Sequence, residues 1–162
     1  MKKYRDNGAV GAFLDEYEKA VAELSILLET ISDTELLTVV DPTTKDPDCK
    51  SIQTILTHVV RAGYVYAMYV RKDQGEALDF RERLPLPSIA EYQKELQLMF
   101  QYNEFLFKDY PNLTLETFEE KDKIHTAWGQ HYDIEQLFEH AIVHILRHRR
   151  QIERFLIILR AA

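Results

Sequence analysis

Residues 132–155 read YDIEQLFEHAIVHILRHRRQIERF. Apolar residues recur in this stretch every three or four positions, which is the spacing of one face of an α-helix. The residues of this apolar stripe are Leu137, Ala141, Ile145, Ile152, Phe155 and, just beyond the quoted stretch, Leu159. Asp133 and Gln136 have the spacing of a helix-capping pair, so we predict a helix from Asp133 to about Arg160.

Two histidines, His144 and His148, fall within this apolar stripe. Side chains four residues apart lie one above the other on a helix, with Cβ atoms roughly 5–6 Å apart, so two imidazoles can reach one ion. His140 continues the series but lies at the edge of the stripe, and eight residues of helix span roughly 12 Å. The inward pair is therefore predicted to be His144 and His148.

A third ligand has to come from another helix, and His58 is the candidate because Ile55, Ala62 and Val65 place it on an apolar stripe. Three imidazoles can hold zinc, nickel or a similar ion and leave coordination positions open, as in catalytic zinc sites. The competing interpretation is that the histidines pack in the core without a metal. His58 on a second stripe favours the metal site.

Further residues are predicted to surround this site. Gln151, about one turn beyond His148, is placed to fix a histidine ring or to touch a bound ligand. Arg147, about one turn from His144, is the candidate for binding an anionic group, and Tyr66 is a candidate for the pocket wall. Arg149 and Arg150 are predicted to be a solvated flank that pairs with nearby glutamates at helical spacing.

Three other segments have helical periodicity and are separated by breakers. The first runs from about Ala9 to Ile31, the second from a cap at Ser51 to Gly75, and the third from a cap at Ser88 to before Pro111. Ser32 and Glu35 have capping-box spacing, which is compatible with a short helical turn. The sequence does not clearly indicate any pair of β-strands. The fold class is predicted to be all-α, a four-helix bundle whose topology these patterns leave open.

Composition narrows the class of protein further. At 162 residues and 46% apolar composition, we expect a single domain over residues 1–162. A net charge of −7 argues against nucleic acid as a partner, and no stretch is long and apolar enough for a membrane span. The chain has one cysteine, Cys49, which cannot form an internal disulfide, and its N-terminal segment does not resemble a leader. We therefore expect a cytoplasmic protein. Cys49 lies in a polar loop and receives no role.

Familiar metal motifs are absent from the sequence. HILRH, residues 144–148, lacks the glutamate that follows the first histidine in zinc peptidases, and no histidine has a glutamate three residues before it as in di-iron bundles. The segment IHTAWGQHYD, residues 124–133, contains His125, Trp128 and His131. It either folds over the mouth of the pocket or anchors an aromatic side chain in the bundle. The aromatic residues of the second and third helices are expected in the core or at a dimer contact.

The whole chain resembles the DinB-like (YfiT-like) four-helix family of metal-binding proteins. The resemblance is carried by SIQTILTHVVRAGYVY, residues 51–66, and above all by the order histidine, three residues, histidine, two residues, glutamine at residues 144–151. It implies an up-down-down-up bundle with a left-handed connection, the ligands His58, His144 and His148, the accompanying glutamine Gln151, a zinc or nickel ion, and a homodimer. Arg150 departs from the pattern, since a small glycine is often found there.

This resemblance also implies chemistry, because the best-characterised members are transferases and isomerases that use low-molecular-weight thiols. The leading hypothesis is a divalent-metal-dependent enzyme that activates a thiol or water for attack on a small molecule, as a thiol transferase or a hydrolase. The alternative is a non-catalytic metal-binding or stress-response protein, which a fourth protein ligand would favour. A third hypothesis is a dimer without metal. No residue is assigned as catalytic from the sequence.

Overall fold

The computed structural model describes residues 4–161 and consists mainly of helices, as predicted. Four of the helices are long and one is short. The long helices are α1 (Gly8–Leu28), α3 (Ile52–Asp73), α4 (Ile89–Asp109) and α5 (Ile134–Ala161), and the short helix is α2 (Asp33–Leu37). Two 3-10 turns, η1 (Pro47–Cys49) and η2 (Glu120–Asp122), lie in the connections.

The helix starts follow the predicted caps. The Ser51 hydroxyl accepts a hydrogen bond from the backbone N–H of Thr54, and Ser88 caps α4 in the same way. At the start of α5 the Asp133 carboxylate accepts from the N–H of Gln136, and the Gln136 side chain accepts from the N–H of Asp133. These bonds satisfy amide groups that have no partner inside the helix, which defines where each helix begins.

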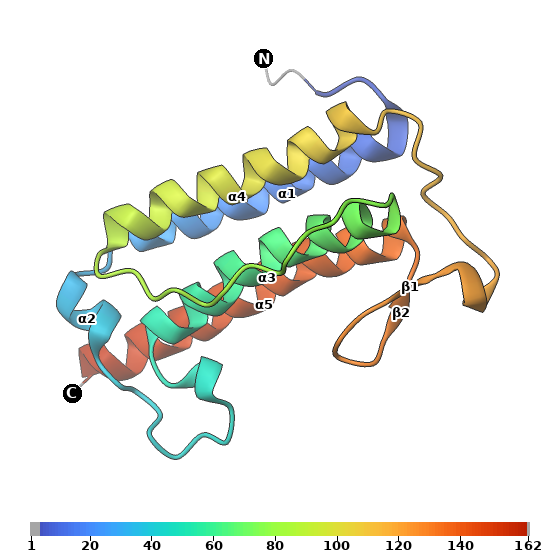
Figure 1. Cartoon of the computed structure of the whole chain (residues 1–162). Helices are drawn as coiled ribbons and strands as arrows, with labels where there is room; N and C mark the ends of the chain where they lie inside the picture. Colours follow the sequence, from blue (N-terminus) through green and yellow to red (C-terminus); the bar gives the residue numbers. More distant parts are fainter. Residues whose placement is uncertain (1–3, 162) are drawn as a thin grey trace.

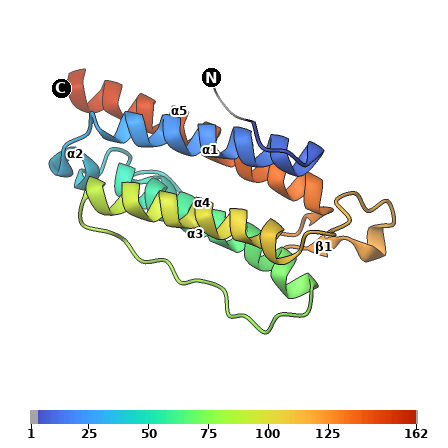
Figure 2. The same cartoon turned by 90° about the horizontal axis from the view of Figure 1, so that it is seen from above.

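The long helices form a bundle in which α1 packs against α4 and α5, and α3 packs against the same two helices. Figure 1 shows that α1 and α5 run in one direction and that α3 and α4 both run in the opposite one. This is the up-down-down-up order that the family resemblance implied. Because α3 and α4 are parallel, residues 74–88 have to return along the length of the bundle, and Figure 2 shows this connection on its outside.

A small hairpin in the α4–α5 connection was not predicted. Strand β1 (Ile124–His125) pairs antiparallel with β2 (His131–Tyr132), and the rings of His125 and His131 stack with centroids 3.7 Å apart. Each strand has only two residues, so neither can show the alternating pattern by which strands are recognised in a sequence. For this reason the sequence gives no clear sign of the pair.

The core lies between the long helices, and Phe138 is at its centre. This side chain is fully buried, and its ring contacts those of Phe13 and Tyr17 from α1 and of Phe107 from α4. Burial of this apolar surface supplies most of the stabilisation that holds four separate helices together.

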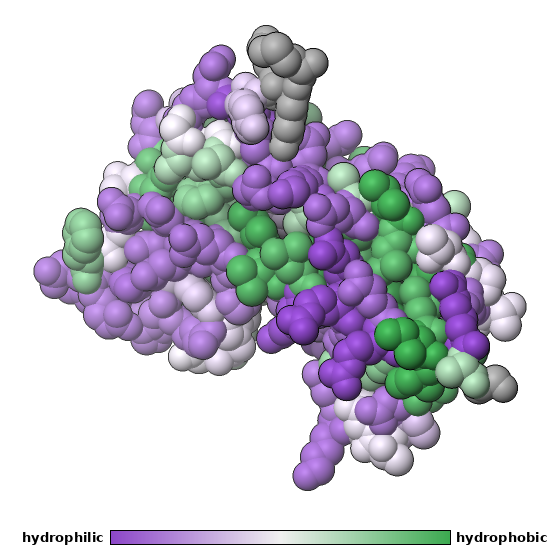
Figure 3. All heavy atoms as spheres, turned by 180° about the vertical axis from the view of Figure 1, so that it is seen from behind, coloured by the Kyte–Doolittle hydropathy of each residue, from purple (hydrophilic) through white to green (hydrophobic). Residues whose placement is uncertain are grey.

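Some large apolar side chains remain on the surface, and several of them belong to α5. Val143, Ile157 and Ile158 are all more than half exposed. From behind, the molecule presents apolar patches interrupted by strongly hydrophilic side chains (Figure 3). In residues 4–161, no helix has both the length and the apolar character that crossing a membrane requires.

Candidate metal site

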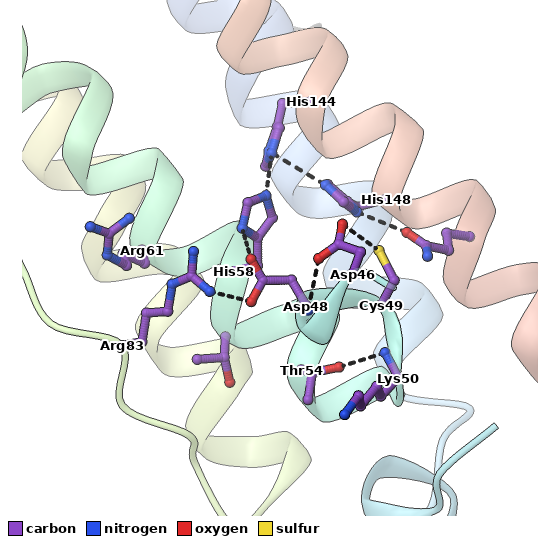
Figure 4. A network of polar contacts seen from close by, with 12 residues as sticks. Asp46, Asp48, Cys49, Lys50, Thr54, His58, Arg61, Arg83, His144 and His148 are labelled. Carbon is purple, nitrogen blue, oxygen red and sulfur yellow. Dashed lines mark hydrogen bonds and ion pairs between the residues drawn. The ribbon is translucent and has the colours of Figure 1, made fainter. Parts of the chain in front are cut away.

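The predicted histidines from two helices meet at one point. His58 of α3 and His144 of α5 bring their Nε2 atoms to 2.8 Å, and the Nε2 atoms of His144 and His148 are 3.2 Å apart. His144 and His148 are buried, and His58 is half-buried. Figure 4 shows the three rings pointing toward one another between α3 and α5. The structure thus brings together the three residues singled out in the sequence.

The outer nitrogens of two rings are held by neighbouring side chains. Nδ1 of His58 lies 3.0 Å from a carboxylate oxygen of Asp48, and Nδ1 of His148 lies 3.0 Å from Oε1 of Gln151. Since these oxygens accept hydrogen bonds, each Nδ1 carries the proton and each Nε2 presents a lone pair to the common point. Gln151 therefore has the orienting position that we predicted for it.

Asp48 reaches His58 because of the local fold of the preceding loop. The Asp46 carboxylate accepts from the N–H of Asp48 and starts the 3-10 turn η1, and η1 packs against α3. Arg83, in the long α3–α4 connection, forms an ion pair with the other oxygen of Asp48. Asp48 is thereby held from both sides, which fixes the ring of His58.

This donor set fits a divalent ion. A tetrahedral zinc ion with Zn–N bonds of about 2.0–2.1 Å separates its nitrogen ligands by roughly 3.4 Å, which is close to the observed spacings. The possible ligand atoms of the three histidines all lie within 4.8 Å of one another, and no other His, Cys, Asp or Glu between residues 4 and 161 joins them. The cluster could hold a metal ion and leave a coordination position free.

Burial keeps these histidines neutral. Desolvation lowers the pKa of His144 to about 2, with further lowering by the neighbouring His148 and His58. Desolvation and His58 also lower the pKa of His148 to about 4. For His58, burial outweighs the attraction of Asp48, so its pKa is lowered as well. At neutral pH the rings are therefore in the form that coordinates metals.

A family model described as DinB superfamily matches residues 16–152, which include all three histidines and Gln151. The chain belongs to the DinB superfamily. Our identification of the family from residues 51–66 and 144–151 is confirmed. A search of curated proteins finds no match.

Tyr66 and Arg147 of this DinB chain both lie next to the histidines. Tyr66 is buried, and its ring centroid is 5.8 Å from that of His144. Arg147 is exposed, with its Nη2 atom 3.5 Å from Nε2 of His148. Arg147 lies at the outer side of the site and lines the pocket beside it, whereas Tyr66 lies beneath His144 and is not among the residues that line that pocket.

A pocket of about 1040 Å³ opens beside the site, between α5 and the loop that precedes α3. His58, His148 and Gln151 line it, as does Cys49. Cys49 receives no role from the sequence, where it lies in a polar loop, yet this loop places it in the same pocket. Its thiol donates to Asp46 across 3.3 Å, as Figure 4 shows.

The prediction for the flanking arginines was half right. Arg149 pairs with Glu153 at 3.6 Å, as expected from helical spacing, and also with Glu23 of α1. Arg150 has no carboxylate partner in the described chain and instead lines the pocket. Arg150 is exposed, as a solvated flank requires, but its predicted pairing with a glutamate is not found. The loop that forms the opposite wall of the pocket could not be foreseen from the spacing on α5.

The remaining histidines of the DinB chain lie outside the cluster. His140 packs beside Tyr66 and Trp128, with ring centroids 5.6 and 6.2 Å away. Trp128 also contacts Tyr66 and Tyr69, and Tyr69 accepts a hydrogen bond from the N–H of Ala127. Trp128 is not among the residues lining the pocket. Of the two possibilities for this segment, the structure favours the anchored aromatic side chain.

The depressed histidine pKa values predict acid sensitivity of the metal-free protein. An unfolded histidine binds a proton below its usual pKa of about 6.5, whereas His148 in the folded chain does so only near pH 4. Between these values the unfolded state binds more protons, so stability falls as the pH falls. His148 alone should lower the free energy of unfolding by about 2 kcal/mol between pH 7 and pH 5. His144, whose pKa is lowered further, should add a similar loss, so urea unfolding should show a total decrease of about 4 kcal/mol.

The variant His148→Gln provides the control for this pH effect, because it removes one of the groups that must stay neutral. Its free energy of unfolding should change less between pH 7 and pH 5 than that of the wild type. Equal pH dependence in the two proteins would contradict the assignment.

Asp48 gives a second prediction. Asp48→Asn removes the charge that orients the ring of His58, and loss of such an outer partner weakens metal affinity by about tenfold. Competition with a chelator measures the zinc affinity. Asp41→Asn is the matched control, because Asp41 lines the same pocket but its carboxylate bonds to Thr43 and not to a histidine. A zinc affinity equal to that of the wild type in Asp48→Asn would refute the orienting role.

Proposed function

We propose that this chain is a divalent-metal-dependent enzyme that activates a thiol or water for attack on a small molecule. The observation that carries the proposal is the convergence of three neutral imidazoles on one point beside an open pocket. His58, His144 and His148 would hold the ion, zinc or nickel. When bound, such an ion supplies Lewis-acid chemistry that lowers the pKa of a thiol or water in contact with it.

The residues of the chain have distinct parts in this proposal. Asp48 and Gln151 hold the protons on the outer nitrogens of His58 and His148, which keeps the inner nitrogens available. Arg147 lies at the outer side of the site and would bind a carboxylate of the thiol. Tyr66 packs under His144 and excludes water from that side.

A low-molecular-weight thiol is the nucleophile we favour, which would make the chain an S-transferase. Membership of the DinB superfamily supports this choice, because its best-characterised members are thiol-dependent transferases and isomerases. The pocket also offers space for a nucleophile larger than water. The alternative within the same site is attack by water, which would make the chain a hydrolase.

The competing function is a non-catalytic metal-binding or stress-response protein. A structural zinc site normally has four protein ligands. The other histidines near the site do not supply a fourth: His131 pairs with Glu120 at 2.5 Å, and His140 packs on Tyr132 and Tyr66. The absence of a fourth ligand among residues 4–161 favours the enzyme.

Two further expectations belong to the proposal. We propose a homodimer, and the half-exposed Phe105 of α4, one of the aromatic residues expected in the core or at a dimer contact, offers a surface for it. We also propose that residues 1–162 act as a single domain, since the helices share one hydrophobic core. A cytoplasmic location is part of the same proposal and rests on the sequence alone.

The test is turnover of an electrophile by the metal-loaded protein with a panel of thiols. Chlorodinitrobenzene serves as the electrophile, and glutathione, cysteine, coenzyme A and bacillithiol serve as thiols. The expected result is turnover that requires one of these thiols and is lost in His58→Ala but retained in His125→Ala, whose side chain lies in the hairpin. Metal binding without any turnover would support the non-catalytic function, and turnover without thiol would support a hydrolase.

A further inference from the structure

The arginines of this chain differ in whether they have a partner. Within residues 4–161, every arginine except Arg147, Arg150 and Arg154 donates to a carboxylate or a carbonyl oxygen. These three lie on α5, are exposed, and all line the pocket beside the histidines. Guanidinium groups in this acidic protein are thus left without anionic partners at one place, the pocket.

The acidic residues of the pocket do not neutralise these arginines. Asp41 accepts hydrogen bonds from the N–H and the hydroxyl of Thr43, and Asp46 accepts from the N–H of Asp48 and the thiol of Cys49. Both carboxylates are therefore used to form turns of the loop. Neither comes within ion-pair distance of Arg147, Arg150 or Arg154.

The spacing of the three arginines defines the shape of what they can bind. Residues three and seven positions apart lie on one face of a helix, and a rise of 1.5 Å per residue separates Arg147 from Arg154 by roughly 10 Å along α5. Between and beside them the pocket wall is apolar, with contributions from Leu146, Phe155 and Ile158. The wall thus alternates cationic groups with apolar surface.

We propose that the pocket binds a small molecule with two anionic groups joined by an apolar carbon segment. Arginine forks match carboxylate and phosphate oxygens with paired hydrogen bonds, so the acidic groups are carboxylates or phosphates. Arg150 and Arg154 hold one end, and Arg147 holds the end nearest His148. The inference rests on the proposed function in naming this molecule as the substrate or thiol of the histidine site.

The overall charge makes this site selective. The chain has a net charge of −7, so an anion is repelled by most of its surface. The pocket is lined by three arginines and two aspartates, which leaves it a formal charge of +1 within an acidic protein, and its apolar walls focus that field. A dianion is consequently favoured at the arginine side of this pocket, away from Asp41 and Asp46.

The experiment measures binding of adipate to the metal-free protein by titration calorimetry. Hexanoate has the same carbon chain and one carboxylate, and it is the reference ligand. The diphosphonate with that carbon chain tests whether the acidic groups of the natural ligand are phosphates instead of carboxylates. The variants are Arg150→Gln and Arg154→Gln, with Lys94→Gln as a control that changes the charge equally on α4, away from the pocket.

We expect adipate or the diphosphonate to bind the wild type about tenfold more tightly than hexanoate, and each arginine variant to lose about tenfold. Whichever dianion binds more tightly identifies the acidic group. Retention of full affinity in both arginine variants, an equal loss in Lys94→Gln, or no binding of either dianion would overturn the inference. Because no metal is present in this experiment, its outcome is independent of whether the histidines bind an ion.

Discussion

His144→Ala is expected to lower the affinity for zinc by about two to three orders of magnitude, which is one ligand's share of the binding free energy of a protein zinc site. Nε2 of His144 is the atom that lies near both of the other histidines, at 2.8 Å from His58 and 3.2 Å from His148. Its loss leaves two ligands on different helices. Elemental analysis of untagged wild type should find about one ion per chain, and the variant should contain almost none.

His125→Ala is the matched control for the metal content, because it also removes an imidazole but from the exposed hairpin. This variant should keep its ion. If the wild type contains no metal even after reconstitution with zinc and nickel, the histidines are packing residues. In that case His58→Ala would change the free energy of unfolding and leave the metal content unchanged.

Phe138→Ala should destabilise the fold by about 4 kcal/mol, at the level typical of truncating a fully buried aromatic side chain. The ring of Phe138 touches aromatic side chains from α1 and α4, so its removal leaves a cavity where three helices meet. Urea unfolding followed by circular dichroism measures the change.

Phe118→Ala is the matched control for this stability effect. Phe118 is 88% exposed, and truncating such a residue changes stability by no more than about 0.5 kcal/mol. Similar losses in Phe118→Ala and Phe138→Ala would mean that Phe138 is not at the centre of the core.

The helices could be predicted because their signals are local. Ser51, Ser88 and Asp133 each cap a helix through a residue three positions later, and that contact is encoded within a few residues. The apolar stripes then place His58, His144 and His148 on inward faces, so the histidine cluster could be predicted from two periodic segments.

The surroundings of the cluster could not be predicted in the same way. Asp48 and Cys49 come from a loop whose path depends on long-range packing, including the pairing of Val39 with Ser51. Arg83 reaches Asp48 from a connection with no periodicity at all. That Arg150 lines the pocket could not be foreseen for the same reason, since the loop decides what faces that side of α5.

The parallel course of α3 and α4 leaves the histidine site between helices that are distant in the chain. His58 and His144 are 86 residues apart. Joining such positions in the unfolded chain costs loop-closure entropy, and a metal clip across a long loop offsets much of that cost. An ion bound by these histidines would therefore act as a removable cross-link, and the melting temperature would rise with the concentration of free metal above the dissociation constant.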